Sequence, residues 1–136
     1  MTQKAAIEDG LFFNKDEAEP HYIALLTNNV KEIMVKEVVN AMTYLNKDEF
    51  SKQKLDVTYL EFDENVFIVW IGPFENLNSS TSYLNKTKNR LSSEILSFIP
   101  AKQYELYILG KSNIVQIKNR DHLQKYKAYM FKNIYK

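Results

Sequence analysis

The order in which apolar runs and amphipathic stripes follow one another most constrains the fold of this chain. Four apolar runs have the length of strands, and each borders on proline, glycine, asparagine or acidic residues that favour turns. The expected strands are residues 21–27, 55–62, 66–71 and 104–109. Three further segments space their apolar residues as helices do. The expected order of elements is therefore βαββαβα.

Each helical segment has one apolar stripe and a recognisable start or end. The first helix is expected to run from Val35 to about Asn46, and Asn78 or Ser79 is expected to cap the second. Asp121, with a glutamine three positions later, predicts the start of the third. The stripes are Val35, Val38, Val39, Met42 and Leu45 in the first helix, Tyr83, Leu84, Thr87, Leu91 and Ile95 in the second, and Leu123, Tyr126, Met130 and Ile134 in the third.

Two similar βαβ halves favour one topology, the α+β ferredoxin-like fold. In it a four-stranded antiparallel sheet carries both crossover helices on one face, and the last helix of this chain is an addition. Gly72-Pro73 is expected to end the third strand, and residues 112–117 fit either a helical turn or a strand. The predicted core between the sheet and the crossover helices comprises Val35, Val38, Val39, Met42, Ile68, Leu84, Leu91 and Leu106.

Length and composition favour one globular domain. The chain has 136 residues, 45% of them apolar, with three glycines and three prolines, which excludes collagen-like and low-complexity classes. We expect a lead-in over residues 1–19 and a single domain over residues 20–136. No run approaches the ~18 apolar residues of a membrane span, and residues 1–14 lack the pattern of a signal peptide.

The residues that usually carry catalysis or hold metals are scarce or scattered. There is no cysteine, and the two histidines, His21 and His122, are far apart in sequence. The adjacent carboxylates at 48–49 and 63–64 fall in turn-like segments, where little desolvation would shift their pKa values. Three isolated glycines form neither a dinucleotide-binding motif nor a phosphate loop. We therefore expect no enzyme activity, no metal and no cofactor.

Aromatic residues on the strands raise the question of a binding face. RNA-recognition modules share this element order and display aromatic and basic residues on their central strands, but the 66–71 strand lacks that pattern. We therefore expect no nucleic-acid binding. Burial in the core or beneath the last helix is the favoured interpretation of the strand aromatics, and a ligand-binding sheet face is the alternative. These residues are Tyr22, Phe67, Trp70 and Tyr107.

The net charge of +1 conceals a strong asymmetry along the chain. Residues 1–64 carry 13 acidic and seven basic residues, whereas residues 101–136 carry two acidic and eight basic residues. A basic segment of this size is either a solvated helix face or a surface for an acidic partner. The candidate partner-binding residues are Lys118, Arg120, Lys125, Lys127 and Lys132.

One segment resembles a known family. Residues 68–91, IVWIGPFENLNSSTSYLNKTKNRL, resemble the SPOR family, in which an apolar strand ends in a Gly-Pro-Phe or Gly-Ser-Phe step before a helix with a small polar start. Residues 18–136 as a whole are similar to the C-terminal domain of large tetratricopeptide-repeat lipoproteins of bacteria with gliding motility and type IX secretion. The further matching positions are Pro20-His21-Tyr22, Leu45-Asn46, Tyr107-Ile108-Leu109, Tyr126, Phe131, Asn133 and Tyr135.

The resemblance implies a SPOR-like fold and a periplasmic location within a larger lipoprotein anchored in the outer membrane. It also implies a non-catalytic role in a secretion or gliding complex, through contacts with other envelope proteins. SPOR domains bind peptidoglycan glycan strands, so glycan binding by the sheet face is an alternative. A small ligand-responsive regulatory domain of the same topology is a third possibility.

Overall fold

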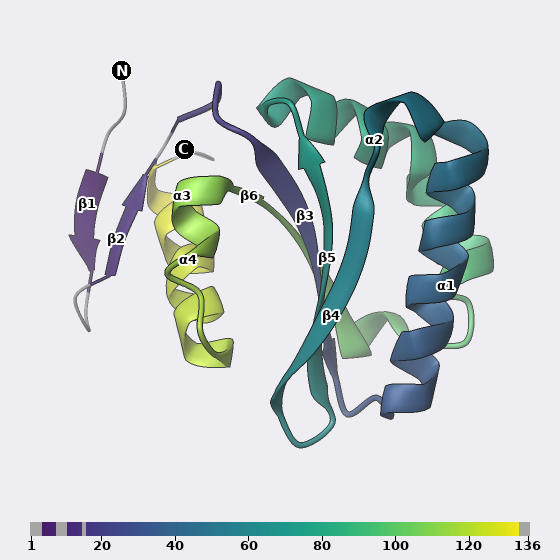
Figure 1. Ribbon diagram of the computed structural model, residues 1–136. Coiled ribbons are helices and arrows are strands. Elements are labelled where there is room, and N and C mark those ends of the chain that lie inside the picture. Colours follow the sequence, from purple (N-terminus) through teal and green to yellow (C-terminus); the bar gives the residue numbers. More distant parts are fainter. Residues whose placement is uncertain (1–3, 8–10, 15, 134–136) are drawn as a thin grey trace.

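The computed structural model describes the backbone of residues 4–7, 11–14 and 16–133, and the side chains of Phe13 and residues 16–129 (Figure 1). The main strands are β3 (His21–Asn28), β4 (Asp56–Asp63), β5 (Val66–Phe74) and β6 (Tyr104–Gly110). The α-helices are α1 (Glu32–Glu49), α2 (Leu77–Arg90), α3 (Lys111–Ile114) and α4 (Arg120–Asn133). Short helical turns cover Ser51–Gln53, Leu91–Ile95 and Ala101–Gln103. A separate hairpin pairs β1 (Lys4–Ile7) with β2 (Leu11–Asn14).

The main sheet confirms the predicted topology. Its strand order is β4-β5-β3-β6, and every neighbouring pair is antiparallel. At the centre, Leu25 of β3 lies opposite Val69 of β5 and Leu106 of β6. Two βαβ units that interlock in this way produce the ferredoxin-like α+β fold, and α4 is the predicted C-terminal addition.

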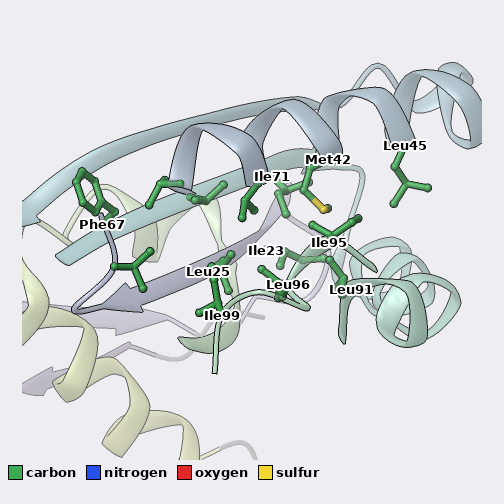
Figure 2. Close-up of a cluster of buried hydrophobic side chains, with 14 of the residues drawn as sticks. Ile23, Leu25, Met42, Leu45, Phe67, Ile71, Leu91, Ile95, Leu96 and Ile99 are labelled. Atoms are coloured by element: carbon green, nitrogen blue, oxygen red, sulfur yellow. The ribbon is translucent and has the colours of Figure 1, made fainter. Parts of the chain in front are cut away.

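Helices α1 and α2 cover one face of the sheet and enclose the larger core (Figure 2). Ile23 and Leu25 of β3 contribute to this core with Val38 and Met42 of α1. Val39, Leu84 and Leu106 are partly buried at its margin, as predicted for core residues. The close-up labels Ile23, Leu25 and Met42 and seven further members, Leu45, Phe67, Ile71, Leu91, Ile95, Leu96 and Ile99.

A second core lies on the opposite face, beneath α4. Ala24, Leu26 and Leu109 point from the sheet toward this side, together with Ile68. The prediction that Ile68 packs under the crossover helices is therefore wrong. Alternation along β5 sends Val69 to one face and Ile68 to the other.

The crossover helices differ from the prediction mainly at their ends. Helix α1 continues three residues past Asn46. Helix α2 is capped by Asn76, whose side-chain oxygen accepts a hydrogen bond of 2.8 Å from the backbone N–H of Ser79. The expected caps, Asn78 and Ser79, are thus inside the helix. Asn76, Asn78 and Ser79 all have side chains that can cap a helix, and α2 begins after the first of them.

Strand β5 continues through Gly72-Pro73 to Phe74, so the prediction that this step ends the strand is wrong. Phe74 lies opposite His21 at an irregularity in the register. Gly72 has φ 155°, and a Cβ there would lie 2.6 Å from Cδ2 of Tyr22 and 3.1 Å from the backbone oxygen of His21. The bulge therefore depends on a residue without a side chain.

We expect Gly72→Ala to lower the free energy of unfolding by more than about 1 kcal/mol. An alanine would have to adopt the positive φ of this position, and its Cβ would clash with the Tyr22 ring. Urea unfolding followed by circular dichroism measures the loss. Glu75→Ala, at an exposed position just beyond the strand, is the control. Equal stability of the two variants would contradict the close approach of residue 72 to Tyr22 and to the backbone of His21.

The C-terminal part begins with the short helix α3, which decides the ambiguity over residues 112–117 in favour of a helical turn. Helix α4 then starts one residue before Asp121. Asn119 is its cap, since its side-chain oxygen accepts a 2.9 Å hydrogen bond from the backbone N–H of His122. Asp121 instead occupies the first turn. Of the predicted apolar stripe, Leu123 and Tyr126 are buried, whereas the side chains of Met130 and Ile134 lie outside the described residues.

The lead-in packs against the domain. Phe13 of β2 is fully buried, and its ring meets that of Tyr126 edge-on with centroids 5.2 Å apart. Tyr129 is its second aromatic neighbour, at 5.7 Å. Phe13 thus belongs to the core beneath α4. Figure 1 shows the hairpin beside α3 and α4, away from α1 and α2.

Candidate functional site

Helix α4 covers the half of the sheet face formed by β3 and β6. Leu123, Tyr126 and Tyr129 form one buried cluster with Tyr107 and Leu109 of β6. The Tyr126 hydroxyl donates a 2.8 Å hydrogen bond to the backbone oxygen of Ile108. This side of the sheet is therefore occupied by the protein itself.

The predicted aromatic sheet face is not one surface. Phe67 is buried under α1 and α2, which agrees with the favoured interpretation of core burial and removes it from the alternative binding face. Tyr107 is only 9% exposed, and its hydroxyl donates to Glu105 at 2.8 Å. Trp70 is half-buried against the core beneath α4, and the half-buried Tyr22 lies opposite Leu109 of the same core. Two aromatic rings are thus available, rather than four.

Toward β4, the face of the sheet on the α4 side is more exposed to solvent. Trp70 lies opposite Thr58, and Ile68 lies opposite Leu60. Thr58 is exposed and Leu60 is 46% exposed, in contrast to the buried residues of β3 and β6. A strip containing Trp70, Thr58 and Leu60 is thus the part of the sheet face that α4 leaves accessible.

The predicted basic residues have three different environments. Lys118 and Arg120 are exposed, just before and at the start of α4. Lys125 forms a 3.1 Å salt bridge with Asp121 one turn earlier, and its side chain is only 18% exposed. Lys127 forms a 3.0 Å salt bridge with Glu105 of β6. The side chain of Lys132 lies outside the described residues.

Lys125 is therefore largely shielded from solvent rather than part of an exposed basic surface. Its ammonium group pairs with the carboxylate of Asp121. Of the candidate basic residues whose side chains the structure describes, the two classed as exposed, Lys118 and Arg120, lie before and at the start of α4.

Glu105 is the centre of the charge network on this side. It accepts hydrogen bonds from the Tyr107 hydroxyl and from Lys127 Nζ. Partial burial opposes its ionisation, but these two hydrogen bonds and the charges of Lys127 and Arg120 outweigh it and hold the pKa of Glu105 below its usual range. Burial, aided by the hydrogen bond to Glu105, raises the pKa of Tyr107. Glu105 thus ties β6 to α4 as a carboxylate.

This network makes stability depend on pH. Because the pKa of Glu105 is lowered in the folded state, its stabilising contribution is present above the ordinary value of 4.5 and is lost as the pH falls through the lowered pKa. We expect Glu105→Gln to melt below the wild type at pH 7, with the difference shrinking toward pH 3. Thermal unfolding of both proteins at each pH is the measurement. A difference that persists unchanged at pH 3 would contradict the role of the carboxylate.

A hollow of about 510 Å³ opens beside this network, between the start of α4 and the adjacent ends of β3 and β6. Its charged lining residues are Lys102, Glu105, Arg120 and Asp121. Asn28, Gln103 and Gln124 add amide groups, and Leu26 and Tyr104 complete the wall. Arg120 was among the residues predicted from the sequence, whereas Lys102 and Glu105 were not. Side chains two residues apart on a strand point to the same face of the sheet. Glu105 could therefore have been predicted beside Tyr107 on the face that α4 covers.

A second hollow of about 500 Å³ lies at the start of α2, on the far side of the sheet. Lys52, Glu75 and Lys86 are its charged residues, and Phe50 and Tyr83 provide apolar surface. The buried Tyr83 hydroxyl donates to the side-chain oxygen of Asn46 at 2.5 Å. That contact joins α1 to α2 and has a structural role.

Neither histidine lies in a cluster of potential ligands. Nδ1 of His21 lies 2.7 Å from the backbone oxygen of Glu19, and Nδ1 of His122 accepts from the backbone N–H of Lys118 at 3.1 Å. Within the described residues, no group of three or more His, Asp or Glu side chains is arranged to hold a metal ion. The carboxylates at 48–49 and 63–64 are exposed, and Glu49 pairs with Arg90 at 2.7 Å.

None of the helices in the part of the chain that the structure describes is long and apolar enough to cross a membrane. Comparison of the chain with protein-family models, with curated proteins and with solved structures finds no match.

Proposed function

We propose that this chain is a non-catalytic interaction module of a bacterial cell-envelope protein, supporting a secretion or gliding complex through protein contacts. The observation that carries the proposal is the position of α4. It covers the β3–β6 half of the sheet face and presents an exposed basic end, at Lys118 and Arg120, beside a polar hollow. A surface of that kind suits a protein partner with acidic side chains.

The SPOR-like resemblance supplies the cellular setting of this proposal: a periplasmic domain of a tetratricopeptide-repeat lipoprotein anchored in the outer membrane. The ferredoxin-like order of β3 to β6 agrees with the fold that the resemblance implies. The secretion or gliding complex itself is inferred from that resemblance.

Site-specific photo-crosslinking tests the proposed surface. A benzophenone amino acid is placed at Lys118 or, as the control, at Tyr44, which is 73% exposed on the opposite side of the molecule. In cells that make the full-length protein, we expect a discrete protein adduct from position 118 and none from position 44. No adduct from position 118, or the same adducts from both positions, would overturn the assignment of this surface.

Binding of peptidoglycan glycan strands is the second candidate, favoured by the accessible strip at Trp70. An aromatic ring beside a hydroxyl-bearing residue such as Thr58 is suited to stacking and hydrogen bonding with a sugar. Co-sedimentation with purified peptidoglycan separates the two functions. A protein-interaction module stays in the supernatant, whereas a glycan reader sediments and is released by Trp70→Ala but not by Tyr44→Ala.

A further inference from the structure

We infer that the hollow at the start of α4 binds an acidic segment of the partner protein, with carboxylates contacting Arg120 and Lys102. The inference rests on the proposed function and names the chemistry of the partner for that surface.

Three separate parts of the chain form the hollow. Arg120, Asp121 and Gln124 come from the first turns of α4, whereas Lys102 and Gln103 come from the turn before β6. Leu26 and Asn28 of β3 and Glu105 of β6 supply the sheet side. The concave shape lets groups from opposite walls reach one bound segment, which a single exposed helix face would not allow.

The charges around the hollow do not balance. Its two acids already have cations of their own, since Glu105 pairs with Lys127 and Asp121 pairs with Lys125. Lys102 and Arg120 add two further positive charges. Neither forms a salt bridge with another residue in the described part of the chain, and the charge of Arg120 also acts on the nearby Glu105. Two cations and two acids line the hollow itself, and counting Lys125 and Lys127 behind the acids gives a surplus of two positive charges, which an anionic ligand would neutralise.

The size and polarity of the site favour a peptide segment. A volume of about 510 Å³ accommodates a few side chains, and the amides of Asn28 and Gln124 provide donors and acceptors for a backbone. Helix α4 also begins here, so its N-terminal end contributes a favourable field for a carboxylate.

The test uses two fluorescein-labelled synthetic probes, a tetraglutamate peptide and a tetraglutamine peptide, with the wild-type chain. Fluorescence anisotropy measures the dissociation constants. Arg120→Gln and Lys102→Gln remove one charge each from the hollow. Lys86→Gln is the matched control, because it removes the same charge from the second hollow on the far side of the sheet.

We expect the tetraglutamate probe to bind the wild type, and the tetraglutamine probe to bind much more weakly. Arg120→Gln and Lys102→Gln should each weaken tetraglutamate binding about two- to fivefold, as the loss of one exposed ion pair does, and Lys86→Gln should leave it unchanged. No tetraglutamate binding, or an equal loss in all three variants, would overturn the inference. Crosslinking from position 118 without tetraglutamate binding would leave the proposed function standing and reject only the acidic ligand.

Discussion

Val38→Asp is expected to unfold the domain. Val38 lies on α1 with 1% of its surface exposed and packs in the core between α1, α2 and the sheet. A carboxylate buried there without a partner costs several kcal/mol, comparable with the whole stability of a domain, about 5–15 kcal/mol. Circular dichroism during heating should show no cooperative transition for this variant.

Asn40→Asp is the control for that experiment. It places the same carboxylate on the same helix two residues later, where the side chain is exposed. Substitutions at such positions change stability by no more than about 0.5 kcal/mol, so this variant should melt close to the wild type. A soluble Val38→Asp protein with a cooperative melt would contradict the packing of α1.

Leu123→Ala is expected to destabilise the protein by about 2–5 kcal/mol, the usual effect of removing a large buried aliphatic side chain. Leu123 is fully buried in the cluster that joins α4 to β3 and β6. The side chain sits where α4 meets the sheet, so its truncation leaves a cavity between them. Urea unfolding monitored by circular dichroism measures the change.

The neighbouring substitution Gln124→Ala provides the comparison, because Gln124 is exposed at the rim of the hollow. Its unfolding curve should overlay that of the wild type. If Leu123→Ala also unfolded like the wild type, α4 would not be docked on the sheet, and the sheet face would be free for a ligand.

The element order and the topology could be predicted because they depend on local periodicity. The acidic turn at residues 63–65 separates two apolar runs, and the structure places a hairpin there, between β4 and β5. The crossover helices likewise show their apolar stripes in the sequence. With two βαβ halves recognised, chain connectivity leaves few alternatives to the observed strand order.

The faces of β5 could not be assigned from the sequence. Helices cover both sides of the sheet, so residues 66–71 are apolar throughout, and no polar alternation marks which side chains share a core. Ile68 was therefore predicted in the wrong core, and the alternative binding face combined Phe67 with aromatic residues from the other side of the sheet. Leu25 and Leu26 of β3, which also point to different cores, present the same ambiguity.

The candidate site was only partly predictable, for a similar reason. The salt bridge between Asp121 and Lys125 follows from helical spacing, since the two residues are one turn apart. The pair formed by Lys127 and Glu105 joins residues 22 positions apart and depends on how α4 docks on β6. Sequence alone shows an excess of basic residues but not which of them are already neutralised.

Co-purification from the cell envelope is the most direct test of the proposed interaction surface. The tagged full-length protein is isolated as wild type, as Lys118→Glu/Arg120→Glu and as Lys36→Glu/Lys86→Glu, and partner proteins are quantified by mass spectrometry. All four lysine and arginine positions are exposed, but the second pair lies on α1 and α2. We expect only the first pair of substitutions to lower partner recovery, by about fivefold or more. Equal recovery of the same partners with both double variants would contradict it.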